Sequence, residues 1–305
     1  MKNTTKNILS GLGVFFLGGL LINASASYDS DNEKDNDIRP VKGYNVYAVD
    51  LPTEVDFAGE KAPLHIPDVR ERLDRELLVN TYWQSNGLLF IKRANRYFPV
   101  IERILKENGV PDDFKYLALI ESGLQDVVSP AGASGFWQFM KAAAKENGLE
   151  ITDQVDERYH LEKATKAACD YLKKSKKSMG SWTLAAAAYN AGNTGVYNQL
   201  TAQKVTDYYD LWLNSETSRY VFRILAIKEI MKNPTQYGFN FESKDLYLEI
   251  PTYQVEVKES IDDLALFAQK YGANFKELKL HNSWLRSNKL TVTAGKSYVI
   301  KIPKK

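Results

Sequence analysis

A single glutamate, Glu121, interrupts an otherwise apolar helix face. In the stretch FKYLALIESG (114–123), Phe114 and Leu117 recur at helical spacing, and Glu121 lies seven residues after Phe114 on the same face. Burial on such a face disfavours the ionised carboxyl and raises its pKa, which suits a general acid working near neutral pH. Glycosidic bond cleavage is the reaction in which such a carboxyl most often occurs. The alternative is a glutamate at a fraying helix end, turned to solvent before Gly123.

Small residues precede an indole and an amide in the stretch SPAGASGFWQFM (129–140). Small residues allow a backbone to approach a ligand closely. Gln138 beside Trp137 could bind the polar and the apolar face of a sugar. The alternative is a glycine-rich loop that caps a helix around a core tryptophan.

Two predicted helices place polar residues at their ends. The alanine-rich stretch LAAAAYNAG (184–192) ends in Tyr189 and Asn190, and the stretch ETSRYVFRILAIKEI (216–230) begins with Glu216 and Tyr220 at i, i+4 spacing. The first could simply be a tight helix crossing. The second could be a solvated face in which Glu216 pairs with Arg219.

In this order and at these spacings, the motifs resemble those of the lysozyme-like lytic transglycosylases. They are Glu-Ser (121–122), Gly-Phe-Trp-Gln (135–138), Ala-Tyr-Asn-Ala-Gly (188–192) and Glu-Thr-x-x-Tyr (216–220). The resemblance covers about residues 90–232 and is greatest to the membrane-bound murein transglycosylase D type. Two features of the family pattern differ. Lys141-Ala142-Ala143 replaces the usual Pro-x-Thr, and the arginine often found soon after Ala-Tyr-Asn-Ala-Gly is absent from the stretch NTGVYN (193–198).

The resemblance implies a helical lysozyme-like domain that cleaves the β-1,4 bond between N-acetylmuramic acid and N-acetylglucosamine in peptidoglycan. The product would carry a 1,6-anhydro-muramyl end, formed without water and without a cofactor. Glu121 would be the only acid/base. The N-acetyl group of the substrate would replace a second enzymic carboxylate, which is an exception to the two-carboxylate scheme.

Seven further residues are implied to form the substrate groove: Ser129, Gln138, Met140, Tyr189, Asn190, Glu216 and Tyr220. Ser129 and Tyr189 would contact and polarise the N-acetyl group, and Tyr220 would lie near Glu121. Gln138 and Met140 would line the sugar subsites. Asn190 and Glu216 would support the hydrogen-bond network of the groove.

Two other functions remain open on the sequence. A hydrolytic muramidase would need a positioned water, commonly held by a second carboxylate, and Asp126, Asp153 and Asp156 are available. A non-catalytic cell-wall-binding protein would have no use for the acid at Glu121.

The C-terminal stretch predicts a strand–helix–helix–strand module over residues 251–303. The segments YQVEV and SYVIKIP alternate as strands do, and two short helical pieces lie between them. This arrangement resembles a LysM domain, which implies a βααβ fold and binding to glycan that contains N-acetylglucosamine. The alternative is a small packing domain without a ligand.

The predicted organisation has five parts. They are a signal peptide (1–26), a disordered acidic leader and extended arm (27–67), a lysozyme-like helical domain (68–235), a linker (236–250) and the LysM-like module (251–305). Lys2 and Lys6, an apolar run and Ala24-Ser25-Ala26 indicate export. Helices are predicted at 68–83, 159–176, 182–189 and 215–231, with a stop at Gly109 and Pro111 and no convincing strand before Met231.

Composition excludes several classes of function. Without Lys2 and Lys6 the chain has 38 basic and 38 acidic residues, so nothing favours nucleic acid or a polybasic membrane patch. Cys169 is the only cysteine, and the three histidines have no metal-ligand spacing. We expect a monomer without a metal, in the periplasm or associated with the cell wall. Because no cysteine lies near the predicted cleavage site, we do not expect a lipoprotein.

Overall fold

The computed structural model describes residues 45–304. The signal peptide predicted for residues 1–26 and residues 27–44 of the predicted leader and arm lie outside this range. All elements named below belong to one compact unit, residues 47–305. Within the described range, every helix is too short or too polar to cross a bilayer.

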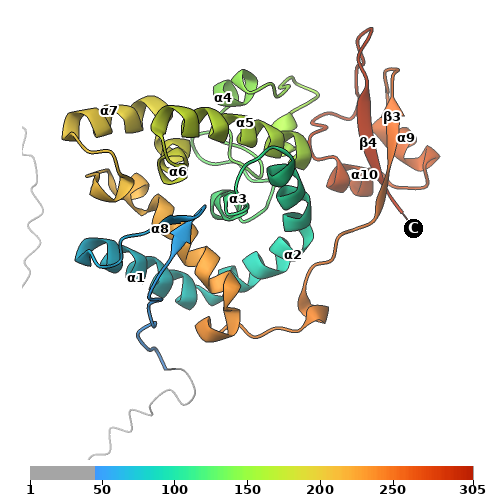
Figure 1. Ribbon diagram of the computed structural model, residues 1–305. Helices are drawn as coiled ribbons and strands as arrows, with labels where there is room; N and C mark the ends of the chain where they lie inside the picture. The colour runs from blue at the N-terminus through green and yellow to red at the C-terminus, as the bar shows by residue number, and fades with distance from the viewer. Residues whose placement is uncertain (1–44, 305) are drawn as a thin grey trace, which may run out of the picture. The chain divides into compact units, whose positions relative to one another are not determined.

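Helices dominate the chain up to Lys232, as Figure 1 shows. In chain order they are α1 (Pro67–Tyr82), α2 (Gln84–Glu107), α3 (Phe114–Ser122), α4 (Lys141–Glu146), α5 (Leu161–Met179), α6 (Trp182–Ala191), α7 (Asn193–Gln203) and α8 (Ser215–Lys232). The mainly helical fold predicted from the sequence is confirmed. The helices α4 and α7 are additions to the predicted ones.

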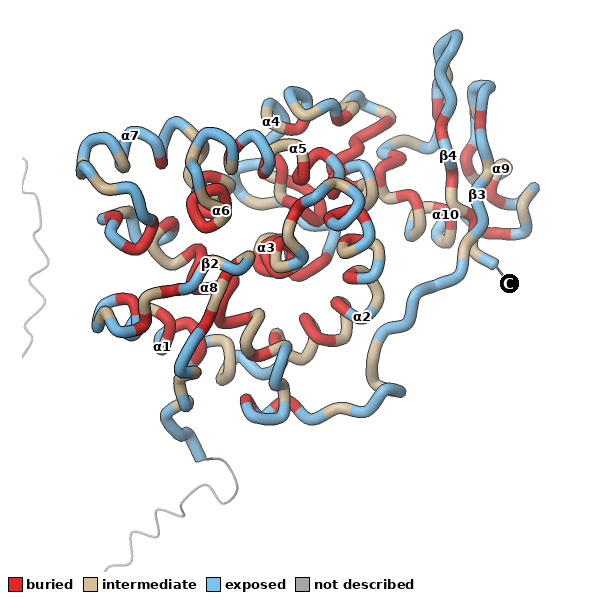
Figure 2. The backbone as a smooth tube through the Cα atoms, in the orientation of Figure 1, coloured by how far each residue is buried: buried red, intermediate tan, exposed pale blue. Residues whose placement is uncertain are grey.

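The helix α3 is the buried centre of this helical part. Seven of its nine residues are buried, and it packs against α2 and α8. Figure 2 shows buried backbone on α3 and on α6 beside it. The alanines 185–188 of α6 are completely buried, which confirms the predicted close packing of an alanine helix. A carboxyl placed on α3 is therefore surrounded by protein on several sides.

The helix α2 ends where the sequence predicts a stop. It runs through the exposed Pro99 and ends at Glu107. Gly109 then adopts a left-handed conformation with φ of 67°, which glycine tolerates without steric cost. The backbone N–H of Gly109 donates to the carbonyl of Lys106 at 3.2 Å. This turn leads the chain into α3.

A short hairpin corrects the prediction that no strand occurs before Met231. The strands β1 (Asp56–Phe57) and β2 (Glu60–Lys61) pair antiparallel. Phe57 is completely buried, with its ring centroid 4.9 Å from that of Phe114. Glu60 accepts hydrogen bonds from the backbone N–H groups of Trp182 and Thr183, at the start of α6. Two-residue strands are too short to show alternation, so the sequence pattern could not reveal them.

The predicted βααβ module is confirmed. It consists of β3 (Thr252–Val257), α9 (Leu264–Lys270), α10 (Phe275–His281) and β4 (Tyr298–Pro303), with β3 and β4 paired antiparallel. The register places Thr252 opposite Pro303 and Val257 opposite Tyr298. Leu264, Leu278 and Ile300 are completely buried in a core of its own.

Residues of the helical part complete the core of the βααβ module. Val155 and Tyr159, which lie before α5, are buried among its apolar residues. The backbone N–H of Asp156 donates to the carbonyl of Trp284 at 2.8 Å, and that of Arg286 donates to the carbonyl of Gln154 at 2.7 Å. The βααβ module is thus packed directly against the helical part.

The segment predicted as a linker, residues 236–250, is held along α2. The backbone N–H of Tyr247 donates to the carbonyl of Lys92 at 3.2 Å. The carbonyl of Leu248 accepts a hydrogen bond from Arg96 Nε at 2.8 Å. Backbone contacts of this kind limit the freedom of the segment between the two parts.

Candidate active site

Glu121 lies in the last turn of α3. Gly123 caps the C-terminal end of α3. It has a left-handed φ of 60° and donates its N–H to the carbonyl of Leu119 at 2.8 Å. The hydroxyl of Tyr220, on α8, donates a short hydrogen bond to Glu121 Oε1. Glu121 retains partial exposure to solvent. Its carboxyl therefore sits in a confined place that a substrate can still reach.

Burial raises the pKa of Glu121 above its ordinary value. The hydrogen bond from Tyr220 and the positive charge of Arg223 act in the opposite direction, and the negative charge of Glu216 adds to the increase. Arg223 itself is fixed by a hydrogen bond from its Nη2 to the carbonyl of Ile120 at 3.1 Å. A raised pKa keeps a larger share of the carboxyl protonated near neutral pH, as a general acid requires.

Tyr189 projects from the C-terminal end of α6. Its hydroxyl donates to the carbonyl of Trp137 at 2.7 Å. Burial raises the pKa of Tyr189 well above its ordinary value, and the charge of Glu121 contributes in the same direction. The hydroxyl is therefore neutral, and its oxygen can accept a further hydrogen bond.

Asn190 and Glu216 form one hydrogen-bonded group at the start of α8. Asn190 Nδ2 donates to Glu216 Oε1 at 3.0 Å, and Thr217 Oγ1 donates to Asn190 Oδ1 at 2.9 Å. Asn214 caps α8 by accepting from the backbone N–H groups of residues 216 and 217. The alternative in which Glu216 pairs with Arg219 is not what the structure shows, since that arginine binds Glu76 instead.

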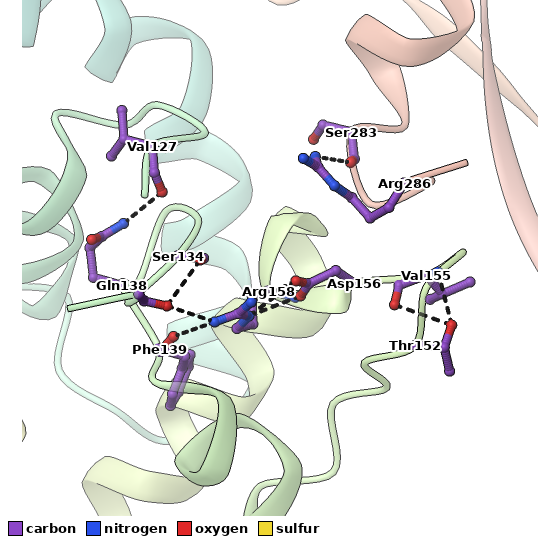
Figure 3. A network of polar contacts seen from close by, with 11 residues as sticks. Val127, Ser134, Gln138, Phe139, Thr152, Val155, Asp156, Arg158, Ser283 and Arg286 are labelled. Atoms are coloured by element: carbon purple, nitrogen blue, oxygen red, sulfur yellow. Dashed lines mark hydrogen bonds and ion pairs between the residues drawn. The ribbon is translucent and has the colours of Figure 1, made fainter. Parts of the chain in front are cut away.

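Gln138 holds the loop that follows α3 in a strained conformation. Its φ is 47°, which is uncommon for a residue with a side chain. Its Nε2 donates to the carbonyls of Val127 at 3.0 Å and Gly135 at 2.8 Å, and Figure 3 shows the first of these contacts. Trp137 beside it is completely buried and donates from Nε1 to Thr165. Trp137 is thus the core tryptophan of the alternative interpretation and does not face a sugar.

Ser129 and Met140 lie on the same loop as Gln138. Ser129 Oγ accepts a hydrogen bond from the backbone N–H of Ala133 at 3.0 Å, which leaves its hydroxyl proton free to be donated. Met140 is 47% exposed. The structure gives neither side chain a direct contact with Glu121 within the described range.

Arg158 stabilises this loop through hydrogen bonds to its backbone carbonyls, although no sequence motif indicated this residue. Its Nη1 donates to the carbonyls of Gly132 at 3.0 Å and Phe139 at 3.2 Å. Its Nη2 forms an ion pair with Asp156 at 2.7 Å. Figure 3 shows Arg158 between Phe139 and Asp156. Gly135 also packs here, because a Cβ at this position would lie 1.9 Å from the carbonyl oxygen of Arg158.

Ser122 joins the loop to the end of α3. Its Oγ donates to the carbonyl of Phe136 at 2.8 Å and accepts from the backbone N–H of Leu124 at 3.1 Å. The side chain is buried. The Glu-Ser motif was the available sequence signal for this role, because the serine immediately follows the candidate acid.

The structure brings five of the eight predicted site residues into one neighbourhood: Glu121, Tyr189, Asn190, Glu216 and Tyr220. Gln138 joins them through the adjacent carbonyl of Trp137, which binds Tyr189. Ser129 and Met140 are connected to this neighbourhood only through their loop. These eight positions remain predicted site residues.

The three aspartates considered for a second carboxylate have other surroundings. Asp156 is paired with Arg158. Burial raises the pKa of Asp126, whereas contacts with Ser283 and with the charge of Arg286 lower it. Asp153 lines a cavity with residues of the βααβ module. Among residues 45–304, no three His, Cys, Asp or Glu side chains gather as metal ligands would.

Two parts of the chain match known domain families. Residues 98–211 match the transglycosylase SLT domain, and residues 253–305 match the soluble lytic transglycosylase C-terminal LysM-like domain. The resemblance to the lytic transglycosylases is therefore confirmed at the level of both domains.

Two relatives carry the name membrane-bound lytic murein transglycosylase D, one from Escherichia coli strain K12 and one from E. coli O6:H1. Each is 28% identical to this chain over 258 residues, which is 82% of this chain and 55% of the relative. The chain thus spans about half the length of these relatives.

Proposed function

We propose that this chain, which carries an SLT domain followed by a LysM-like domain, is a lytic transglycosylase of peptidoglycan. The bond cleaved is the β-1,4 bond between N-acetylmuramic acid and N-acetylglucosamine. One observation carries this proposal. Within the SLT match, Glu121 is a confined carboxyl with a raised pKa and a hydrogen bond from Tyr220.

Glu121 begins the reaction as a general acid. Its protonated carboxyl donates the proton to the glycosidic oxygen as the bond from C1 of the muramyl residue to that oxygen breaks. The leaving N-acetylglucosamine then departs with a free 4-hydroxyl group. Tyr220 stabilises the carboxylate that is formed, because its hydroxyl donates to Glu121 Oε1.

The N-acetyl group of the muramyl residue supplies the first nucleophile. Its carbonyl oxygen bonds to C1 as the leaving group departs. Tyr189 supports this step because its hydroxyl proton is already donated to the carbonyl of Trp137, so its oxygen can accept the acetamido N–H. Accepting that N–H makes the amide oxygen more nucleophilic. Ser129, whose hydroxyl proton is free, contacts the same acetamido group and helps to orient it.

The product forms when the 6-hydroxyl of the muramyl residue attacks C1 and displaces the amide oxygen. The carboxylate of Glu121 takes the proton of that hydroxyl and returns to its starting state. The 1,6-anhydro end contains no oxygen from water. A hydrolytic muramidase would instead add water at C1, and its second carboxylate is harder to assign here because Asp156 is paired with Arg158.

Mass spectrometry of the released muropeptides separates the two chemistries. The protein is incubated with purified sacculi and the products are analysed without reduction. We expect anhydro-muramyl ends, one water lighter than the hydrolytic product. Reducing muramyl ends would reject the transglycosylase mechanism but would retain glycosidase activity. Absence of any cleavage would reject both and favour a wall-binding protein.

We also propose that the LysM-like domain binds glycan and that the chain is exported to the cell envelope. The domain match supports glycan binding. The basic residues and apolar run within residues 1–26 support export. N-terminal sequencing of protein recovered from the envelope is expected to begin at Ser27. Retention of Met1 in that protein would contradict cleavage after Ala26, and a protein that remains in the cytoplasm would contradict export.

A further inference from the structure

A cavity of about 290 Å³ lies beside Glu121, and all of its lining residues except Ile120 lie outside the SLT match. One wall is formed by α1, α2 and the turn between them, through Val79, Asn80, Trp83 and Phe90, and the lining also includes Ile120 and Glu216. The SLT match begins only at residue 98. The turn between α1 and α2 is therefore a contribution of this chain that the family match does not describe.

The cavity adjoins the candidate acid. Ile120 immediately precedes Glu121, and Arg223, whose charge lowers the pKa of Glu121, also lines the cavity. Glu216 lines it as well and acts on the same carboxyl. A glycan that crosses Glu121 can therefore continue into this space without leaving the site.

Trp83 presents a large apolar surface at this cavity. The residue is 58% exposed, and Val79 beside it is 43% exposed. The backbone at Trp83 is fixed, because its N–H donates to the carbonyl of Val79 and its carbonyl accepts from the N–H of Gly87, both at 3.0 Å. An exposed indole on a rigid turn is preorganised to stack on a flat apolar partner.

The charges of the cavity are balanced. Glu76 is buried and binds Arg219 through two contacts, Nε to Oε1 at 2.6 Å and Nη2 to Oε2 at 3.3 Å. With Glu216 and Arg223, the lining carries two acidic and two basic side chains. A neutral polar cavity with one aromatic wall suits an uncharged sugar ring. It suits the carboxylates of a wall peptide less well, because there is no excess of positive charge.

We propose that Trp83 is the stacking platform of a saccharide subsite next to Glu121. The apolar face of an N-acetylhexosamine ring lies on the indole, and its hydroxyl groups face Asn80 and Arg219. This inference rests on the proposed function and adds a specificity-determining residue to it. It assigns to the turn between α1 and α2 a role in holding the glycan strand.

Acrylamide quenching of tryptophan fluorescence tests this directly. Trp137 and Trp284 are buried, whereas Trp83 and Trp212 are the most exposed, at 58% and 87%. Trp212 does not line the cavity. In a Glu121→Gln, Trp212→Phe protein, quenching therefore reports mainly on Trp83. In the matched Glu121→Gln, Trp83→Phe protein it reports mainly on Trp212.

Peptide-free glycan strands, at concentrations shown by calorimetry to saturate the protein, are the probe. We expect them to reduce the quenching constant of the Trp83 reporter about twofold, since a bound ligand loses most of its contact with solvent. The Trp212 reporter should not change. We also expect Trp83→Ala to weaken strand binding about tenfold, the equivalent of about 1.4 kcal/mol, and Trp212→Ala to leave it unchanged.

Three results would overturn the inference. They are unchanged quenching of Trp83 at saturation, protection by peptide-bearing strands alone, and failure of the strands to bind at all. None of these depends on turnover, because the proteins lack the acid. Cleavage of sacculi by the wild-type protein decides the proposed function separately. Strands bound only by the LysM-like domain would leave the quenching constant of Trp83 unchanged, so such binding cannot be mistaken for the expected result.

Discussion

At the residue scale, burial and hydrogen bonding have opposite effects on the pKa of Glu121. Burial raises the pKa of this carboxyl, and the contacts with Tyr220 and Arg223 lower it without cancelling the increase. A carboxyl in this balance can be protonated before bond cleavage and can hold a negative charge after it. This is the property that a single acid/base needs to perform both steps.

Replacing Glu121 by Gln should remove the acid and preserve the shape of the side chain. We expect cleavage of sacculi to fall by about 10²- to 10⁴-fold, which is the usual contribution of a positioned general acid. The measurement is release of soluble muropeptides, with circular dichroism as the control for folding. Cleavage at the wild-type rate would show that another group is the acid.

Replacing Tyr220 by Phe should shift the pH dependence of the rate. Its hydroxyl lowers the pKa of Glu121, so its loss raises that pKa further. A general acid is active below its pKa, and the basic limb of the pH–rate profile should therefore move to higher pH. Tyr209→Phe is the matched control, because this buried tyrosine hydroxyl has no partner within residues 45–304. A shift to lower pH, or equal shifts in both variants, would contradict the assignment.

At the element scale, the loop between α3 and α4 is a rigid support for Gln138. Ser122 binds it at one end, Arg158 holds two of its carbonyls, and Gln138 itself binds two more. Such a network offsets the strain of the left-handed φ at Gln138. Loop positions can then be as well ordered as positions in a helix.

Two glycines of this loop allow the destabilisation caused by a steric clash to be measured separately from that caused by backbone strain. Gly132 and Gly135 both have positive φ, 87° and 77°, but only at Gly135 would a Cβ collide with Arg158. We expect Gly132→Ala to cost about 1–2 kcal/mol from strain alone. Gly135→Ala should cost clearly more and should also reduce cleavage. The measurement is thermal unfolding together with activity on sacculi. Equal losses in both variants would show that the close approach to Arg158 is unimportant.

At the scale of the whole molecule, the LysM-like domain is packed against the helical part. Val155 and Tyr159 enter its core, and Lys301 on β4 forms an ion pair with Glu162 on α5. Although burial alone would raise the pKa of Glu162, its contacts with His160 and Lys301 lower it to about 2. The LysM-like domain is thereby held against the helical part that carries the candidate active site.

The ion pair predicts a pH-dependent stability. Because the folded pKa of Glu162 lies below its ordinary value of 4.5, its contribution is complete above about pH 5 and is lost as the pH falls towards 2. We expect Glu162→Gln to lower the free energy of unfolding by about 1–3 kcal/mol at pH 7. The difference from wild type should disappear near pH 2. Glu146→Gln, at an exposed position on α4, is the control. Denaturant titration at several pH values measures the effect, and a pH-independent difference would contradict it.

The sequence by itself determined the mainly helical fold, the βααβ module and the neighbourhood of the site. Helical periodicity marked α5 and α8, and the alanine run marked α6, whose residues 183–188 are all buried. The motif order indicated the family, with which the domain matches agree, and predicted the candidate acid and its partners. These features are local in sequence or repeat at a fixed spacing, so they can be read without a structure.

Only the tertiary structure decided the features that depend on contacts between distant segments. The β1–β2 hairpin exists because Phe57 packs on Phe114 and Glu60 caps α6. Arg158 supports the loop through backbone carbonyls, whose position no side-chain pattern encodes. Trp137 is a core residue and Trp83 an exposed one, which the residue type alone does not decide. Burial is a property of the assembled chain, because it depends on which distant residues arrive at the same place.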